Sequence, residues 1–275
     1  MNLNTLKAKD TYIARKKIRS PFRYPGSKYQ AIKFILPFWK KCKPDEYREP
    51  LAGGGAVFFA LPKVKFNWLN DIDKELMTTY KIIQNPMKRK QLIQLLSLEI
   101  VSKKRYNEIK KFKPKNDMEI AFKYFYLNRT SYSGIMKLPN WGYRNDRSVP
   151  PSKWGERIEV TGKKLEGVIL TDLDYHDVIE APPKGNKVFL FVDPPYYATD
   201  QKRAYQFSFE KKDHIEVCKT LKKTEYNFCL TYDAHKDIYR MYDWANIQPA
   251  SWRYHTANSN KASRKMGSEL IITNF

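Results

Sequence analysis

The 275-residue sequence has few cysteines, no long hydrophobic run and a shortage of acidic residues. Its three cysteines, Cys42, Cys218 and Cys229, form no C-x-x-C pair, which indicates reduced thiols and excludes a disulfide framework. No apolar stretch approaches the roughly 20 residues of a membrane helix, and the first ten residues lack the apolar region of a secretory signal. We therefore expect a cytoplasmic protein that engages neither a membrane nor a metal.

The shortage of acids leaves a large positive charge on the chain. Lys and Arg number 51 against 29 Asp and Glu, which gives a formal net charge of +22. Such a charge favours a polyanionic partner, although solubility or a membrane-surface role would also account for it. Apolar residues make up 42% of the chain, enough to build a substantial core.

One apolar stretch ends in a group of residues suited to binding a planar base. Five apolar residues at 188–192 predict a strand buried on both faces, and two prolines end it. Asp193 then lies at the carboxyl end of a buried strand, where open α/β sheets bind ligands. Asp193 and the Pro194 carbonyl offer two acceptors to an exocyclic amino group, and the Tyr196 ring is suited to stack on a base. A simple strand-ending turn explains the tetrapeptide about as well.

Segments nearer the start of the chain fit a nucleotide-like ligand. A Pro-Gly turn lies between Tyr24 and Lys28, as it would in a ligand-binding turn or an ordinary loop. The glycines Gly53 to Gly55 permit close approach of a ligand to the backbone. Asp71 follows a predicted strand at 64–69, at about the 20-residue spacing from the glycines at which Rossmann-like folds hold ribose hydroxyls. A helix cap is the structural alternative for Asp71.

Residues 85–165 differ from the α/β pattern on either side. A helix is predicted at 118–128, and a polar loop rich in Trp and Arg follows it. Basic, aromatic and amide side chains interleaved in this way suit a nucleic-acid surface, whereas a solvated face explains the lysine-rich part at 99–115 nearly as well. The side chains that best fit such a surface are Asn128, Arg129, Tyr132, Arg144 and Arg147.

The α/β pattern resumes with a short strand that leads to Asp174, on the same carboxyl edge as Asp71 and Asp193. We therefore expect an α/β protein whose Rossmann-like core has a mixed, mainly parallel sheet with helices on both faces. Residues 21–84 and 166–275 form this core, residues 85–165 form an inserted, mostly helical lobe, and residues 1–20 form a basic arm.

Taken together, these motifs resemble the Dam-like DNA adenine-N6 methyltransferases, which use S-adenosylmethionine. The resemblance covers about residues 20–275 and departs mildly at Leu51, where the family often has an aromatic residue, and at Tyr24, where Trp is common. The matching segments occur in the family's order and are 23–28 (RYPGSK), 49–55 (EPLAGGG), 70–73 (NDID), 128–134 (NRTSYSG), 193–196 (DPPY) and 269–274 (ELIITN).

The resemblance implies a fold, a reaction and roles for particular residues. A Rossmann-like methyltransferase core would transfer a methyl group from S-adenosylmethionine to N6 of an adenine flipped out of a specific double-stranded DNA sequence, leaving S-adenosylhomocysteine and using no metal. Asp193, Pro194 and Tyr196 would hold the adenine, and the inserted lobe would recognise DNA. The residues implied in cofactor binding are Tyr24, Lys28, Gly53, Gly55, Asp71, Asp174 and Asp193.

The same resemblance suggests a biological setting and leaves rivals open. We expect a monomer in a bacterial or phage-infected cell, in a restriction-modification, phage or DNA-marking context, with a restriction endonuclease as a functional partner. The rivals are an RNA adenine-N6 methyltransferase and a non-catalytic nucleic-acid-binding module on a Rossmann-like core. Asp193 in place of the Asn that RNA and protein amide methyltransferases often carry argues against the first, and the intact tetrapeptide argues against the second.

Overall fold

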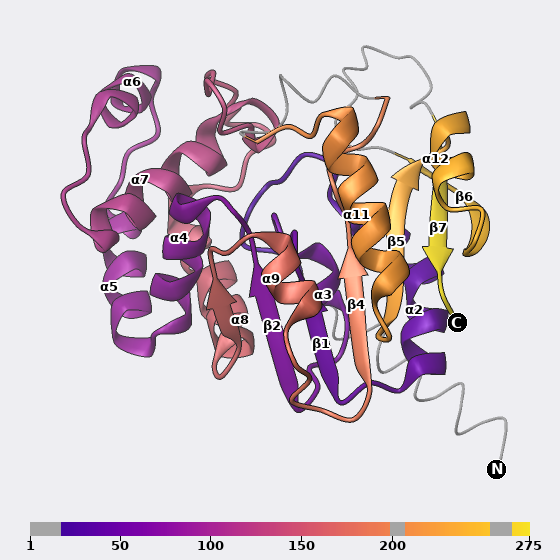
Figure 1. The fold of residues 1–275 in the computed structure, drawn as a ribbon. Helices are drawn as coiled ribbons and strands as arrows, with labels where there is room; N and C mark the ends of the chain where they lie inside the picture. Colours follow the sequence, from indigo (N-terminus) through magenta and orange to yellow (C-terminus); the bar gives the residue numbers. More distant parts are fainter. Residues whose placement is uncertain (1–17, 199–206, 254–265) are drawn as a thin grey trace, which may run out of the picture.

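A seven-stranded sheet forms the centre of the computed structural model, which describes residues 18–198, 207–253 and 266–275 (Figure 1). The strand order is β3-β2-β1-β4-β5-β7-β6, and all pairs are parallel except those that β7 makes with β5 and β6. This is a Rossmann-like α/β sheet, so the predicted fold class is confirmed. The strands are β1 (Glu46–Glu49), β2 (Phe66–Asn70), β3 (Ile169–Thr171), β4 (Val188–Val192), β5 (Asn227–Asp233), β6 (Asn246–Arg253) and β7 (Met266–Thr273).

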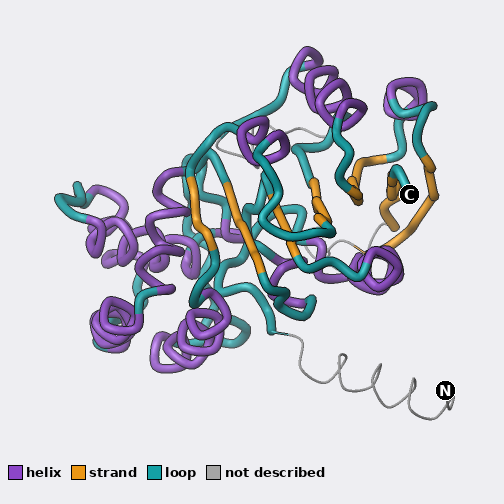
Figure 2. The backbone as a smooth tube through the Cα atoms, turned by 60° about the horizontal axis from the view of Figure 1, so that its bottom comes forward, coloured by secondary structure: helices purple, strands orange, loops and turns teal. Residues whose placement is uncertain are grey.

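Helices cover both faces of the sheet (Figures 1 and 2). On one face lie α9 (Tyr175–Glu180) and α11 (Lys211–Lys223), and on the other lie α2 (Ile32–Cys42) and α3 (Ala56–Ala60). Alternate residues of β4 belong to two separate buried clusters, one on each face. Since neither face of β4 meets water, all five of its residues are apolar, which is why its sequence predicts a strand so clearly.

The neighbouring strand β1 is also buried, but three of its four residues are charged. Arg48 is completely buried, and its Nε lies 2.7 Å from Oε1 of Glu46. The Arg48 guanidinium also donates to the carbonyls of Val178, Ala181 and Pro182 at 2.8–2.9 Å. These contacts supply hydrogen-bond partners to the buried Arg48 guanidinium and join β1 to the end of α9. Strand β1 can therefore be buried inside the sheet although its sequence is not apolar.

The stretch 85–165 supplies helices that pack beside β3 and against α4 (Lys74–Gln84), at one end of the sheet (Figure 1). Its apolar side chains belong to the same buried cluster as those of α3 and α4, so this stretch and the first half of the sheet share a core. Whether it acts as a separate DNA-recognition lobe stays a prediction. The helices are α5 (Pro86–Ser97), α6 (Lys103–Lys111), α7 (Asp117–Thr130) and α8 (Trp154–Leu165), with 3-10 turns at Tyr132–Gly134 and Pro151–Lys153.

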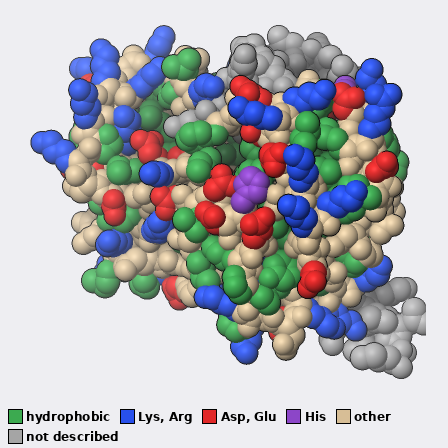
Figure 3. All heavy atoms as spheres, viewed as in Figure 1, with side chains coloured by type: hydrophobic (Ala, Val, Ile, Leu, Met, Phe, Trp, Pro, Cys, Tyr) green, Lys and Arg blue, Asp and Glu red, His purple; other side chains and the backbone are tan. Residues whose placement is uncertain are grey.

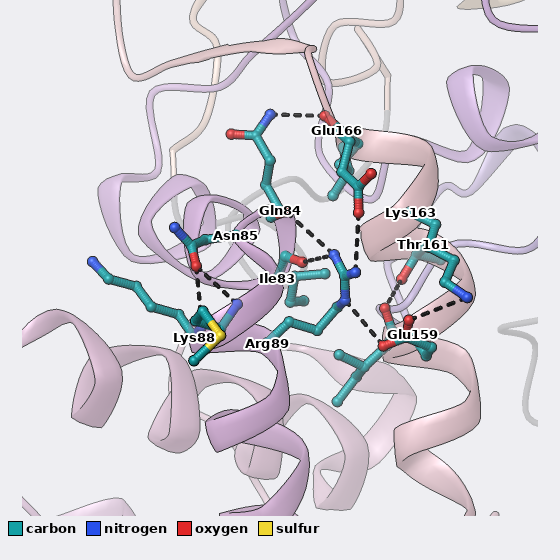
Figure 4. A network of polar contacts seen from close by, with 12 residues as sticks. Ile83, Gln84, Asn85, Lys88, Arg89, Glu159, Thr161, Lys163 and Glu166 are labelled. Atoms are coloured by element: carbon teal, nitrogen blue, oxygen red, sulfur yellow. Dashed lines mark hydrogen bonds and ion pairs between the residues drawn. The ribbon is translucent and has the colours of Figure 1, made fainter.

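Arg89 on α5 fixes the junction between this stretch and the sheet (Figure 4). Its guanidinium lies 3.0 Å from Glu159, near the middle of α8, and 3.0 Å from Glu166, the residue that follows this helix. It also donates to the last carbonyls of α4, at Ile83 and Gln84. One buried cation thereby joins three helices at the point where the chain leaves the sheet and returns to it.

Most of the basic arm predicted at 1–20 lies outside the described residues. Helix α12 (Lys236–Met241) and the short 3-10 turn η1 (Lys28–Ala31) complete the elements used below. Across residues 18–198, 207–253 and 266–275, no helix combines the length and apolar character that a bilayer crossing requires.

The buried ion pair of β1 predicts that breaking it destabilises the protein more than breaking an exposed ion pair does. Arg48→Met should lower the free energy of unfolding by about 3–5 kcal/mol, because it leaves the buried Glu46 carboxylate without its partner. Arg105→Met, which breaks the more exposed pair with Glu99 on the protein surface, should cost about 1 kcal/mol or less. Urea denaturation of both variants measures the difference, and equal losses would contradict the role assigned to Arg48.

Candidate active site

A cavity that is open to solvent lies at the carboxyl ends of the parallel strands. This is the edge at which open α/β sheets bind ligands. The predicted residues Tyr24, Lys28, Gly53, Asp71 and Asp193 all line this cavity, although they come from four separate parts of the chain.

Asp193 is held in place by two side chains from other elements. The Nζ of Lys28, in η1, lies 2.7 Å from Oδ1 and 2.8 Å from Oδ2 of Asp193. The Thr231 hydroxyl, near the end of β5, donates to Oδ1 at 2.7 Å. Lys28 is only 3% exposed and also donates to the Gly26 carbonyl. The carboxylate is therefore oriented and partly neutralised before any ligand arrives.

This arrangement changes the place predicted for Lys28. The resemblance implies a cation that contacts the cofactor, whereas the Lys28 ammonium is bound to Asp193 on the wall of the cavity. A ligand that uses Asp193 must therefore share that carboxylate with Lys28.

Tyr196 also differs from its prediction. Its ring is 8% exposed, and the Lys28 Nζ lies 4.5 Å from the ring centroid. Its hydroxyl donates a hydrogen bond to the buried Glu269 of β7. The ring therefore lies beneath Lys28 and does not offer the open stacking surface that the sequence predicts.

The backbone after Tyr196 is also fixed to β5. Asp233, the last residue of that strand, accepts hydrogen bonds from the backbone N–H groups of Tyr197 and Ala198, both at 2.9 Å. The Asp-Pro-Pro-Tyr segment is thus anchored at both of its ends, as a preorganised site requires.

The glycine turn and Tyr24 fit together at the opposite wall of the cavity. A Cβ atom on Gly53 would lie 2.6 Å from the Tyr24 ring, and one on Gly54 would lie 2.8 Å from Tyr24 Cβ. Gly53 also has a φ of +47°, in the left-handed region that favours glycine. The first two glycines therefore leave room for Tyr24.

Gly55 has a different role from the one predicted. A Cβ there would meet Phe59 and Tyr80 in the core, and Gly55 is absent from the residues that line the cavity. It precedes α3 with a φ of +60° and serves the start of that helix.

Asp71 stabilises the glycine turn through a hydrogen bond with its backbone. Its Oδ2 accepts from Gly53 N at 2.7 Å, and its Oδ1 accepts from Asp73 N at 3.0 Å. The capping alternative belongs to Asp73, whose carboxylate accepts from two N–H groups at the start of α4. Burial raises the pKa of Asp71, while its hydrogen bonds with the backbone oppose that rise.

Asp174 is not among the residues that line the cavity, and its contact with a cofactor stays a prediction. It is an exposed residue that caps α9, accepting from His176 N at 2.9 Å and lying 2.7 Å from His176 Nδ1. The strand that leads to it ends at Thr171, three residues earlier.

Among the residues predicted to contact DNA, Asn128 is buried in this structure. The side chain is 0% exposed, and its amide joins the backbone N and O of Arg23 at 2.9 and 2.8 Å and also donates to the Gly134 carbonyl. It secures the segment before Tyr24 to the loop after α7. Tyr132, Arg144 and Arg147 are exposed, so they stay available for the predicted role.

Arg129 belongs to a group of half-buried arginines beside the cavity wall. Burial, followed by the charges of Arg23 and Arg157, lowers the pKa of Arg129 to about 10. Arg23 directly precedes the cavity residue Tyr24, and its guanidinium donates to the carbonyls of Arg129 and Ser131. Within the described residues, Arg23, Arg129 and Arg157 form no ion pair with a carboxylate, so they present uncompensated positive charge.

Sequence reasoning gave no role to several residues of the site. The place of Thr231 in the site follows from the strand order, because this residue lies near the carboxyl end of the strand next to β4. Glu49 and Glu269 stand in segments that match the family, but nothing in the sequence indicates that both are buried. Burial raises the pKa of each carboxyl to about 8, so neutral carboxyl groups predominate at both positions at pH 7.

Comparison with known proteins shows which family this chain resembles. The family model described as D12 class N6 adenine-specific DNA methyltransferase matches residues 24–256. The type II methyltransferase M.MjaIII of Methanocaldococcus jannaschii is 28% identical over 93% of this chain and 99% of that protein. M1.LlaDCHI of Lactococcus lactis subsp. cremoris is 24% identical over 93% and 95% of the two chains. M.CviBI of Paramecium bursaria Chlorella virus NC1A is 29% identical over 71% and 75%.

The buried carboxyl of Glu49 predicts a pH dependence of stability. Its pKa is about 8 in the folded chain and about 4.3 in an unfolded one, so the folded state binds the proton more tightly. Its contribution to stability is therefore full below about pH 4.3 and is lost as the pH rises to about 8. Glu49→Gln should flatten the fall in unfolding free energy between pH 5 and pH 8.

Urea denaturation at the two pH values measures this effect. Glu180→Gln, at an exposed position on α9, is the matched control and should keep the pH dependence of the unchanged protein. Identical slopes in Glu49→Gln and in the unchanged protein would show that Glu49 does not titrate in this range.

Proposed function

The chain belongs to the D12 class of N6 adenine-specific DNA methyltransferases, and we propose that it uses S-adenosylmethionine to methylate an adenine held at Asp193. The family establishes the reaction on DNA and confirms the predicted resemblance; the cofactor and the residue roles are our proposal. The observation that supports it best is the buried-strand carboxylate Asp193, held by Lys28 and Thr231 at the wall of a cavity that also contains the glycine turn.

The cavity residues fit the proposed cofactor. The Gly53–Gly54 turn and the Tyr24 ring form one wall, and Asp71 lies behind the turn. The buried carboxyl groups of Glu49 and Asp71 suit a ligand that carries positive charge, because a nearby cation favours their ionised form. When bound, S-adenosylmethionine supplies a methyl group activated by its sulfonium.

Asp193 and Pro194 would act on the adenine amino group. One oxygen of the Asp193 carboxylate would accept an N6–H, and the Pro194 carbonyl would accept the other. Both acceptors stabilise the positive charge that develops on N6 as it gains the methyl group, and that charge is relieved when N6 releases a proton. Lys28 and Thr231 keep the carboxylate in one orientation, so little reorganisation is needed.

The target base must leave the duplex to reach this carboxylate, which costs a few kcal/mol. The half-buried arginines Arg23, Arg129 and Arg157 are well placed to hold the DNA backbone while this happens, since they adjoin the cavity wall at Tyr24. Their uncompensated charge attracts phosphate groups. The exposed Tyr132, Arg144 and Arg147 would extend the same surface.

The surface carries both signs of charge. On the face shown in Figure 3, Lys and Arg side chains are spread over much of the surface, and a group of acidic side chains lies near its middle. We further propose a monomer that works in the cytoplasm of a bacterial or phage-infected cell, paired functionally with a restriction endonuclease. The type II methyltransferases that the chain resembles support that setting.

The first test of this function is Asp193→Asn. The substitution keeps the size of the side chain but removes the charge that Lys28 and the developing N6 cation face, so the single-turnover methylation rate should fall ~10²–10³-fold. Binding of the cofactor, measured by calorimetry, should change much less. Because the substitution leaves the buried Lys28 ammonium without its anionic partner, thermal unfolding of the variant is measured as a control for lost stability. A rate within about threefold of the unchanged enzyme would place the chemistry elsewhere.

The second test concerns Arg129 and Arg157. Replacing each by Gln should weaken DNA binding and reduce the slope of log K against log salt concentration by roughly 0.9 for each lost phosphate contact. Arg240→Gln, on α12 at the far end of the sheet (Figure 1), removes one exposed charge and should leave the slope unchanged. Fluorescence anisotropy across a salt series measures all three, and equal slopes would exclude these arginines from the DNA path.

A further inference from the structure

Glu269 is a buried carboxyl group that the reaction described above does not use. It lies on β7, directly opposite Asp233 of β5, and none of its surface is exposed. One oxygen, Oε2, accepts a hydrogen bond from the Tyr196 hydroxyl, whereas Oε1 is buried and has no hydrogen-bond partner among the described residues. A buried carboxyl with an unsatisfied oxygen is costly to fold, so its presence beside the Asp-Pro-Pro-Tyr segment calls for a function.

The contacts around Glu269 lead step by step to Asp193. Glu269 holds the hydroxyl of Tyr196, and the Tyr196 ring lies 4.5 Å beneath the Lys28 ammonium. Lys28 in turn lies 2.7 Å from Asp193. A hydrogen bond to its hydroxyl limits the displacement of the ring, and the ring in turn supports the ammonium above it. Glu269 is therefore linked to Lys28 through Tyr196.

We propose that Glu269 is a positioning residue for methyl transfer: it holds the Tyr196 ring as the floor on which Lys28 rests, and thereby fixes the carboxylate of Asp193. This inference rests on the proposed adenine site at Asp193. It assigns the last strand of the sheet a direct part in aligning the catalytic segment, although β7 contributes no residue to the cavity lining.

The protonation state of Glu269 gives the inference a pH-dependent consequence. The pKa of Glu269 is raised to about 8, mainly by burial and also by the negative charges of Asp193 and Asp233, while the Tyr196 hydrogen bond and the charge of Lys28 oppose the rise. The carboxyl is neutral below about pH 8 and ionises above it. An ionised Glu269 competes with Asp193 for the Lys28 ammonium. The Asp193 carboxylate should therefore be held less firmly as the pH rises.

Three variants of the full-length enzyme test the inference in single-turnover methylation with saturating DNA and S-adenosylmethionine. Glu269→Met removes the acceptor but keeps similar volume, and the rate should fall roughly tenfold or more, as expected when one aligned hydrogen bond is lost. Tyr196→Phe removes the donor and should cause a similar fall. The double variant should be no slower than either single variant, because both break the same contact.

Glu269→Gln separates positioning from a merely structural role. Its amide oxygen still accepts from Tyr196, so the rate at pH 7 should stay within about threefold of the unchanged enzyme. Because the amide cannot ionise, the decline in rate above about pH 8 should be smaller in this variant. Glu46→Gln, a buried carboxyl at the amino end of β1, is the matched control and should lower thermal stability without changing the rate or its pH profile.

Several outcomes would overturn the inference. They are a Glu269→Met rate within threefold of the unchanged enzyme, additive losses in the double variant, or a Glu269→Gln variant as slow as Glu269→Met. Should Glu269→Met fail to fold, the Glu269→Gln pH profile and Tyr196→Phe decide the matter alone. The proposed function has a separate test: loss of activity in Asp193→Asn with full activity in Glu269→Met would leave the adenine site standing and remove only Glu269.

Discussion

Four carboxyl groups lie at one edge of the sheet, three of them buried, and the cost of burying their charge is the constraint that the site must satisfy. Glu49 and Asp71 lie at the ends of β1 and β2, Asp193 follows β4, and Glu269 lies on β7. Burial disfavours the ionised form of a carboxyl group, and nearby negative charges add to that effect. The structure meets this constraint in two ways: it pairs Asp193 with Lys28, and it raises the pKa values of Glu49 and Glu269 to about 8.

This division leaves Asp193 as the carboxylate of the site that a paired cation orients. Lys28 stabilises its charge, and Thr231 fixes one of its oxygens. The cost of placing a charge near the core is thus met before a substrate binds, which is what electrostatic preorganisation requires. The neighbouring arginines have the opposite character, because Arg129 and Arg157 face no carboxylate within the described residues. A cavity lined by carboxyl groups beside a basic wall suits a cationic cofactor and an anionic polymer.

The sequence predicts those parts of the fold and site that depend on local chemistry. The apolar run of β4 indicates a doubly covered strand, and the position of Asp193 after it follows from the two prolines. The glycine turn and Asp71 follow from their spacing, and both line the cavity. Strand β1 could not be predicted in this way. Its Glu-Tyr-Arg-Glu sequence resembles a surface segment, and Arg48 becomes a core residue only because carbonyls at the end of α9 surround it.

Contacts between distant segments decide where several of the predicted site residues lie, and the sequence does not show these contacts. Asn128 appears polar and available in the sequence, but it joins a backbone 105 residues away. Asp174 ends a strand as the other acids do, yet the chain turns there into α9 and the side chain caps that helix. Tyr196 has the right ring for stacking, but Lys28 and Glu269 already occupy its face and its hydroxyl.

The antiparallel strand β7 explains why the end of the chain matters to a segment 73 residues before it. Inserted between β5 and β6, β7 places Glu269 opposite Asp233 in the register. Asp233 binds the backbone after Tyr196, and Glu269 binds the Tyr196 hydroxyl, so paired residues of two strands fix one turn from both sides. A parallel neighbour would need a long crossover connection, whereas the antiparallel pairing lets the last strand enter beside the site. The antiparallel pairing of β5 with β7 therefore also holds the Asp-Pro-Pro-Tyr segment in place.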